Sequence, residues 1–472
     1  MTYRFDCSPI KTSLLPAFLL ALLFCPPLFA DIIGINKQIA LHEDDFRSLS
    51  SEFYRKASAR PDENLTIITD IDQLQAEVNR LLENQLSTRA ILLLHLNVDT
   101  ITDNLDHKAV FEFTELLLEN NAWQLASTLL DTIQNEGDRY LLATIQFIFA
   151  KYYASRNEWD QVSRLLDGMF NELSREDVEY AYLLHGVALQ NLKKHRQAIE
   201  SFKKVPGSSQ YYAYAQLNIA VANIRQGWWT DAHTTIANVI DFTDKDNNDE
   251  VINRLYLILG YSLLQKEFYR DARNAFRHIG LDSRYTNRAL LGIGLTATSQ
   301  GDFVGGLNAL SILNEKQSYD LSVDESYLLI PYVYEKLEQE VTATASYNDA
   351  INYYQQRLDA LNKIANKRID FSAVQFHDQA NSMVIQSNDL NYGKIYPESF
   401  FNNYRILIDL SRAGHNTGLE PEVKKLLARY DTMFQEIIGV LLNQRKEYIK
   451  SYLNQSRYGL ARLYDKSNEG AE

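Results

Sequence analysis

Cysteine, proline and glycine are all scarce in this chain. Its 472 residues include 2 Cys, 9 Pro and 19 Gly, while 46% of the residues are hydrophobic. Both cysteines, Cys7 and Cys25, lie within the first 30 residues. If that segment is removed, no thiol is left for a disulfide, a zinc thiolate or a cysteine nucleophile. The apolar content and the lack of low-complexity tracts favour an ordered chain over a disordered one.

Motifs for catalysis and metal binding are absent as well. None of the 9 histidines stands in a His-Glu-x-x-His pattern, and we expect His185 and His195 to be packing or surface residues rather than metal ligands. Gly292 and Gly294 lack the third glycine and the preceding strand of a dinucleotide fingerprint. The sequence also has no Gly-x-Ser-x-Gly elbow and no phosphate loop. We therefore expect a protein that is not an enzyme and that needs no metal or cofactor.

The apolar run near the start of the chain is short for a membrane span. Arg4 and Lys11 precede this run, which covers 14–24, whereas a span needs roughly 20 apolar residues. A basic start, a short apolar run and a small residue at Ala30 indicate a signal peptide over the first 30 residues. We predict export to a bacterial periplasm, cleavage near Ala30 and no stable membrane span afterwards. An uncleaved anchor, lipidation at Cys25 and a eukaryotic secretory route are the alternatives.

Basic residues are outnumbered by acidic ones. The chain has 61 Asp and Glu against 47 Lys and Arg, a formal net charge of −14. Such a charge repels nucleic-acid phosphates and anionic membrane surfaces. We therefore expect a protein or peptide partner, and no nucleic acid.

A recurring spacing organises the middle of the chain. A small residue is followed twelve positions later by a second small residue, and four positions after that by a large apolar one. Close helix pairs need small residues where their backbones approach and a bulky residue one turn further on. The clear copies are Gly186, Ala198, Phe202; Ala220, Ala232, Ile236; Gly260, Ala272, Phe276; and Gly294, Gly306, Leu310. Weaker copies are Thr114, Ala126, Leu130; Ala150, Val162, Leu166; and Pro331, Ala343, Tyr347.

Turn residues fall seven positions after the first small residue, where a helix pair needs its connection. They are Asn121, Asn157, Gly227 and Gly301. The second small residues of the clear copies lie 34, 40 and 34 positions apart. This frame resembles the tetratricopeptide repeat family over residues 107–365, most strongly over 179–310. The resemblance implies an all-α fold, a superhelix of antiparallel helix pairs.

One copy of the repeat contains an acidic insertion, residues 241–250. It superficially resembles a calcium-binding loop. Counted from Asp244, the glycine that such a loop needs at its sixth position is replaced by Asp249, and the glutamate at its twelfth by Leu255. We therefore expect a solvated connector.

The two flanks differ from the repeats. Residues 31–106 are expected to form an N-terminal helical cap, with helices at about 42–59 and 70–96. Residues 366–472 are expected to form a C-terminal helical region with a long helix over 421–464. Its apolar residues are spaced alternately by three and four, as in a helix seam: Leu427, Tyr430, Phe434, Ile437 and Leu441. This helix either folds back on the array or forms a coiled-coil seam for a partner or a homo-oligomer.

The resemblance also implies a concave face formed by the first helix of each pair. Carried over by position, that face would contain Tyr180, Gln190, Asn191, Tyr214, Arg225, Arg254, Tyr261, Gln265 and Arg288. Aromatic and arginine side chains often dominate binding energy, although these residues could also simply cover helix surface. The positions at which chaperone-binding relatives clamp a terminal carboxylate include Leu183, Val187, Leu217 and Val221 here, which argues against that ligand.

The predicted function is a periplasmic scaffold that binds other proteins, within an assembly or transport complex of the cell envelope. The alternatives are the superhelical part of a cell-wall-acting system or of a polysaccharide-export system. Nothing beyond residue 365 resembles a separate peptidoglycan-cutting domain.

Overall fold

The computed structural model describes residues 26–59, 65–242, 250–316, 320–371, 375–378, 383–386, 398–412 and 417–469. This part of the chain is helical apart from one short antiparallel hairpin, β1 (Gln375–Asp378) and β2 (Met383–Gln386). The N-terminal helices are α2 (Pro26–Ser58), α3 (Ile71–Glu83), α4 (Ser87–Leu96), α5 (Val98–Thr102), α6 (Lys108–Glu119) and α7 (Trp123–Glu136). The middle contains α8 (Arg139–Ser155), α9 (Trp159–Leu166), α10 (Arg175–Asn191), α11 (His195–Phe202), α12 (Tyr212–Arg225) and α13 (Trp229–Phe242). Then follow α14 (Glu250–Gln265), α15 (Tyr269–Arg277), α16 (Thr286–Ser299), α17 (Phe303–Asn314), α18 (Leu321–Lys336), α19 (Glu340–Ala365), α20 (Glu398–Arg412) and α21 (Glu420–Glu469).

The helices from α6 to α19 form pairs, as the repeat predicts. The four predicted turn residues all adopt a left-handed backbone, with φ of 53° at Asn121, 61° at Asn157, 76° at Gly227 and 81° at Gly301. Three further residues at the same position of the frame do so without being Gly or Asn: Lys193, Glu267 and Glu338. The connection between the two helices of a pair therefore requires a left-handed backbone at this position. Glycine or asparagine there only lowers the energy of that backbone conformation.

Close packing explains the small residues of the frame. A Cβ atom added at Gly186 would lie 2.4 Å from the ring of Phe202, and one added at Gly260 would lie 2.5 Å from the ring of Phe276. The next inner helix approaches the same ring, because a Cβ at Gly292 would also lie 2.5 Å from Phe276. Phe202 and Phe276 thus fill the space left by a glycine within their own pair, and Phe276 also fills the space left by a glycine of the next pair.

The repeat spacing continues on the C-terminal side of the four clear copies. In the Pro331 copy, Ala343 and Tyr347 are buried, and the proline lies inside α18.

At the N-terminal side, the prediction of a single helix over 70–96 is wrong. The chain instead forms α3 and α4, because Gln85 adopts a left-handed backbone (φ 58°) and ends the first helix.

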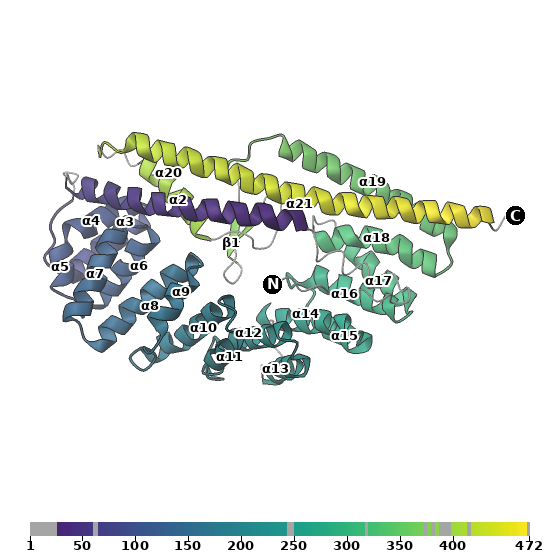
Figure 1. The fold of residues 1–472 in the computed structure, drawn as a ribbon, viewed down its shortest axis with the longest axis horizontal. Helices are drawn as coiled ribbons and strands as arrows, with labels where there is room; N and C mark the ends of the chain where they lie inside the picture. Colours follow the sequence, from purple (N-terminus) through teal and green to yellow (C-terminus); the bar gives the residue numbers. More distant parts are fainter. Residues whose placement is uncertain are drawn as a thin grey trace.

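The C-terminal helix α21 is 50 residues long and crosses from one end of the array to the other. The array curves, and α2 and α21 lie side by side across its open side (Figure 1). The first part of α21 packs against α2 and α20, and its later part packs against α18 and α19. The long C-terminal helix is confirmed, and its bounds exceed the expected 421–464.

The apolar core joins the two ends of the array. One cluster combines side chains between Ile35 and Tyr152 with others between Leu328 and Leu453. Within it, the seam residues Tyr430, Phe434, Ile437 and Leu441 are buried against other parts of the same chain. This burial supports a helix that folds back on the array. The repeats between the ends bury their side chains in smaller, separate clusters.

Two expectations fall wholly or largely outside the described residues. These are the signal segment up to residue 25 and most of the acidic insertion, residues 243–249. The backbone of α2 begins at Pro26, so the cleavage expected near Ala30 would fall within its first turns. Among the helices of the described residues, none is long and apolar enough to cross a membrane.

Candidate functional site

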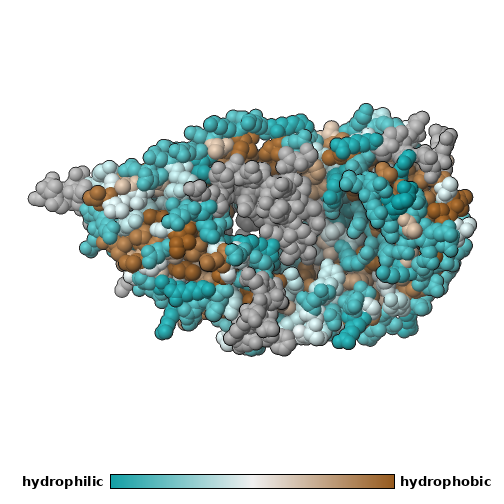
Figure 2. Space-filling view, turned by 180° about the vertical axis from the view of Figure 1, so that it is seen from behind, coloured by the Kyte–Doolittle hydropathy of each residue, from teal (hydrophilic) through white to brown (hydrophobic). Residues whose placement is uncertain are grey.

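The inner face of the array is formed by the first helix of each pair. Helices α10, α12, α14 and α16 lie on the side that faces α2 and α21, whereas α11, α13 and α15 lie on the outside (Figure 1). Seen from the other side of the molecule, the surface is mostly hydrophilic with separate hydrophobic patches (Figure 2). On the face shown there, the hydrophobic residues form separate patches and not one continuous apolar surface.

Four of the nine predicted residues line one cavity of about 400 Å³ on this inner face. They are Arg254, Tyr261 and Gln265 of α14 and Arg288 of α16. The remaining lining comes from α12 to α16 and was not predicted: Ile224, Trp229, Leu257, Ile258, Ser262 and Tyr285. An aromatic and aliphatic wall with a few polar groups at its edge is the usual composition of a ligand pocket.

The aromatic wall of this cavity is held by specific contacts. The hydroxyl of Tyr261 donates a hydrogen bond to the carbonyl of Arg288 (2.9 Å), which ties α14 to α16. The Tyr261 ring also packs edge-on against Phe276, with ring centroids 4.9 Å apart. Burial raises the pKa of the Tyr261 hydroxyl. Trp229, which also lines the cavity, has Lys266 Nζ 4.4 Å from its ring centroid.

The inner helices around this cavity are locally basic. Helices α12, α14 and α16 together carry four charged side chains: Arg225, Glu250, Arg254 and Arg288. Glu250 already accepts hydrogen bonds from Ser283 Oγ (2.8 Å) and from the backbone N–H of Arg284 (3.1 Å). The three arginines form no ion pair within the described part of the chain. In a protein with a net charge of −14, this is a local reversal of sign.

The other predicted residues do not join the cavity. Tyr180 packs between the rings of Phe147 and Tyr211, at centroid distances of 5.9 and 5.0 Å. Asn191 donates to the carbonyl of Val187 (2.9 Å) near the end of α10. Gln190 is only 7% exposed, so the prediction that it lies on a binding surface is corrected: it packs between helices. Tyr214 and Arg225 are exposed.

Comparisons with known proteins found similarity in fold. No family model and no curated protein matches the sequence. One similar structure is the C-terminal part of a TPR repeat-containing protein from Cytophaga hutchinsonii, at 15% identity and a TM-score of 0.43. The match covers 51% of this chain and 94% of that one. The apo form of RapI matches at 12% identity and a TM-score of 0.41, covering 77% and 98%. Yeast Tom70 matches at 13% and 0.32, covering 67% and 68%.

The helix pairs, their left-handed connections and their glycine-to-aromatic packing decide the fold independently of those distant matches. The array is tetratricopeptide-like. At such low sequence identity, the matched structures carry no information on the partner of this chain.

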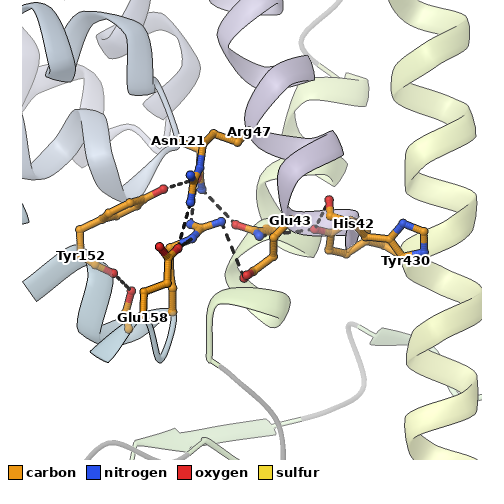
Figure 3. A network of polar contacts seen from close by, with 10 residues as sticks. His42, Glu43, Arg47, Asn121, Tyr152, Glu158 and Tyr430 are labelled. Atoms are coloured by element: carbon orange, nitrogen blue, oxygen red, sulfur yellow. Dashed lines mark hydrogen bonds and ion pairs between the residues drawn. The ribbon is translucent and has the colours of Figure 1, made fainter. Parts of the chain in front are cut away.

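A polar network lies at the N-terminal end of the tetratricopeptide-like array (Figure 3). The side-chain oxygen of Asn121 accepts hydrogen bonds from Tyr152 Oη (3.1 Å) and from Arg156 Nη1 (3.0 Å). Its Nδ2 donates to Asn403 of α20 (3.0 Å). Arg156 also lies 3.7 Å from Glu43 of α2, whose pKa is raised by burial. This network ties the array to α2 and α20, so its first role is structural.

A second cavity, of about 300 Å³, adjoins this network between α6, α8 and α20. Its polar lining includes Glu115, Glu119, Lys151, Asn402 and Asn403. Lys151 pairs with Glu115. Burial, followed by the charge of Glu115, raises the pKa of Glu119. The charged groups largely offset one another here, unlike those on the inner helices α12 to α16.

A third hollow, of about 520 Å³, is lined by residues of α9, α10 and α11 and contains a Ser–His pair. His185 Nδ1 lies 3.2 Å from Ser201 Oγ, and burial lowers the pKa of this histidine. The Ser201 hydroxyl donates to the backbone carbonyl of Tyr182 (2.9 Å). Its proton is therefore directed away from the histidine, which makes a poor nucleophile–base pair.

Acidic and histidine side chains do not converge on a possible metal position. Over the described residues, no group of three or more His, Cys, Asp or Glu side chains is arranged to hold a metal ion.

Proposed function

We propose that this chain is a protein-binding scaffold, and that the inner face of its tetratricopeptide-like array holds an anionic segment of the partner. The observation that carries the proposal is the cavity beside Tyr261, with Arg254 and Arg288 at its edge and no ion pair to either guanidinium from a described residue. Arginine beside aromatic side chains is typical of the residues that dominate protein interfaces. Carboxylates complement arginine in geometry as well as in charge.

The size of the cavity also suits a short segment. About 400 Å³ is at the lower end of the range for ligand pockets. The aromatic wall can receive an apolar side chain of the partner while the arginines at the edge contact its carboxylates. Because the cavity lies on the inner side of a curved array, neighbouring helices can continue the contact along an extended chain.

We further propose that the protein works in the periplasm of a bacterium, within an assembly or transport complex of the cell envelope. The support is the basic and apolar start of the sequence, with a small residue at Ala30. Fractionation of cells that express the full chain tests this location, with the N-terminus of the mature protein read by mass spectrometry. Recovery of the intact, uncleaved chain in the cytoplasmic fraction would contradict it.

The test of binding uses photo-crosslinking in cells. A crosslinking amino acid replaces Gln265, which lies in the cavity, and in a parallel strain it replaces the exposed Arg270 on the outer helix α15. We expect Gln265 to capture a defined protein and Arg270 not to capture it. The combined variant R225A/R254A/R288A is expected to reduce this capture at least about tenfold, which corresponds to about 1.4 kcal/mol.

The matched control is R196A/R270A/R277A, which removes three exposed arginines from α11 and α15 on the outside of the array. Equal losses for the inner-face and outer-face variants would show that overall charge, and not the inner face, governs capture. If no protein is captured from Gln265, the inner face is not the partner surface.

The alternative function, a part in a cell-wall-acting system, is tested with a zymogram on purified peptidoglycan. Clearing by the pure chain would replace the scaffold proposal.

A further inference from the structure

The cavity of about 300 Å³ between α6, α8 and α20 contains buried polar atoms that the fold leaves without hydrogen bonds. Arg156 and Ser399 both line it and are only 6% and 3% exposed. Arg156 Nη1 donates to Asn121, but its Nε and Nη2 form no hydrogen bond with any described residue. Ser399 Oγ forms none with them either. Buried polar atoms are costly to leave in this state, so these atoms require partners from a ligand or from ordered water.

The walls of this cavity are fixed by contacts that do not use the open positions. Asn121 accepts a hydrogen bond from Tyr152 (3.1 Å) and donates one to Asn403 of α20 (3.0 Å), and Figure 3 shows Asn121 and Tyr152 within the network. Asn403 Nδ2 donates in turn to Tyr430 Oη of α21 (3.4 Å). Side chains held in this way lose little conformational freedom when a ligand binds, which favours binding of a small molecule.

A hydroxyl group fits the open positions at Arg156 better than a charged group does. The carboxylates of Glu43 and Glu158 each lie 3.7 Å from this guanidinium. A ligand carboxylate would therefore meet two like charges, and a ligand ammonium would meet the guanidinium itself. A hydroxyl can accept a hydrogen bond from Arg156 and donate one in turn, either to Ser399 Oγ or to Glu43 Oε1, which also lacks a hydrogen-bond partner among the described residues. Burial raises the pKa of Glu43, and the Arg156 charge and the Ser399 hydroxyl oppose the rise, so these three groups lie close together.

The rest of the lining suits a molecule that has C–H faces as well as hydroxyls. Leu118 and Ile148, which are 2% and 5% exposed, give the cavity an apolar wall. At the edge, Lys151 pairs with Glu115, and Glu119 is exposed, so the charges there are paired or solvated. A volume of about 300 Å³ is at the lower end of the range for ligand pockets, so the cavity has room for one small ligand.

We propose that this cavity binds a small, neutral, polyhydroxylated ligand, a single sugar of hexose size, and that Arg156 and Ser399 are the buried residues that recognise its hydroxyls. The inference does not depend on the partner of the inner face. Because the lining comes from the array helices α6 and α8 and from α20, a bound sugar would hold α20 more firmly against the N-terminal end of the array.

Isothermal titration calorimetry on the full chain tests this with the neutral hexoses glucose, galactose and mannose, the anionic glucuronate and the cationic glucosamine. We expect at least one neutral hexose to bind, in the millimolar range or tighter, as is usual for so small a ligand. Both charged sugars should bind more weakly. Hydrogen exchange should then show added protection in α6, α8 and α20 with the bound hexose, and none in α14 to α16. No binding by any neutral hexose, or tighter binding of a charged sugar, overturns the proposal.

Three variants of α20 locate the bound sugar. S399A removes a hydroxyl that has no hydrogen-bond partner among the described residues, so it should fold normally yet bind the hexose roughly three- to tenfold more weakly. N402W places a bulky ring at a residue that lines the cavity and should abolish binding. The matched control is S411A, at an exposed serine of the same helix whose hydroxyl donates to the carbonyl of Ile408, and it should bind normally. Equal affinities for S399A and S411A, or full binding by N402W, also overturn the proposal.

Discussion

The repeats in the middle of the array and the two ends of the array bury their apolar side chains in different ways. Between α8 and α18, four separate clusters each involve a few consecutive helices. At the ends, side chains from residues 35–152 and 328–453 share one cluster, because α21 contacts both regions. The middle is thus held by neighbours in sequence, as in other repeat proteins, whereas the ends depend on contacts between distant segments.

This difference predicts different consequences of damage. In the middle, a lost contact should loosen one or two helix pairs. At the ends, a lost contact in α21 should affect both ends together, because they share its surface. The polar side chains show the same division: Asn121 bonds Asn403, 282 positions away, and Arg429 pairs with Asp45, 384 positions away.

The largest expected effect comes from removing α21 altogether. A chain that ends at residue 419 loses the helix that completes the shared core, and we expect α2, α20, α18 and α19 to lose protection from hydrogen exchange. Helices α10 to α16 should keep most of theirs, since their clusters do not include α21. Equal loss of protection in all helices would show that the middle also depends on α21.

A smaller but still large effect is expected from D324A. This change leaves Arg445 and Arg357 buried without their shared carboxylate, and losing one partner of a buried ion pair costs about 3–5 kcal/mol. Chemical denaturation should show this loss in the free energy of unfolding of the ends. The control is E447A, at an exposed pair, where about 0–1 kcal/mol is expected. Similar midpoints for the two variants would rule out a central role for the buried cluster.

Two glycine-to-alanine changes probe packing in the middle against packing along α21. In G260A the new Cβ would lie 2.5 Å from the Phe276 ring, and overpacking of this kind costs about 1–3 kcal/mol. Gly439, in α21, has no atom within 4 Å of such a Cβ, so G439A should stabilise its helix by about 0.5–1 kcal/mol. Thermal unfolding should show shifts of opposite sign. A gain in stability for G260A would mean that Phe276 moves aside easily.

The smallest expected effect concerns the connections between helices. Gly227 has a left-handed backbone (φ 76°) with open space around its Cβ position, so G227A should cost about 1 kcal/mol through backbone strain alone. Lys193 has a similar backbone (φ 63°), so K193G relieves strain but adds freedom to the unfolded chain, and a change within about 1 kcal/mol is expected. Denaturation midpoints measure both. A G227A chain as stable as the unmodified one would show that the connection tolerates another conformation.

The sequence by itself determined the tetratricopeptide-like pairs. Its signals are local: Gly260, Ala272 and Phe276 stand sixteen positions apart or less, and glycine or asparagine marks four of the turns. It missed the turns at Lys193, Glu267 and Gln85, because other residues can also take a left-handed backbone when helix packing stabilises it. Position in the repeat also placed Arg254, Tyr261, Gln265 and Arg288 on the inner face, but it could not show Gln190 to be buried.

Only the tertiary structure decided how the array is closed and what completes its sites. The seam of α21 predicted either a helix folded back on the array or a coiled-coil seam for a partner or second copy, and the fold shows that the same chain covers it. Trp229 joins the cavity from the start of a second helix, and Glu43 meets Arg156 across more than a hundred residues. Contacts between distant segments produce no repeating spacing of residues in the sequence. They depend on where long helices cross in space, and that is set by packing between distant segments.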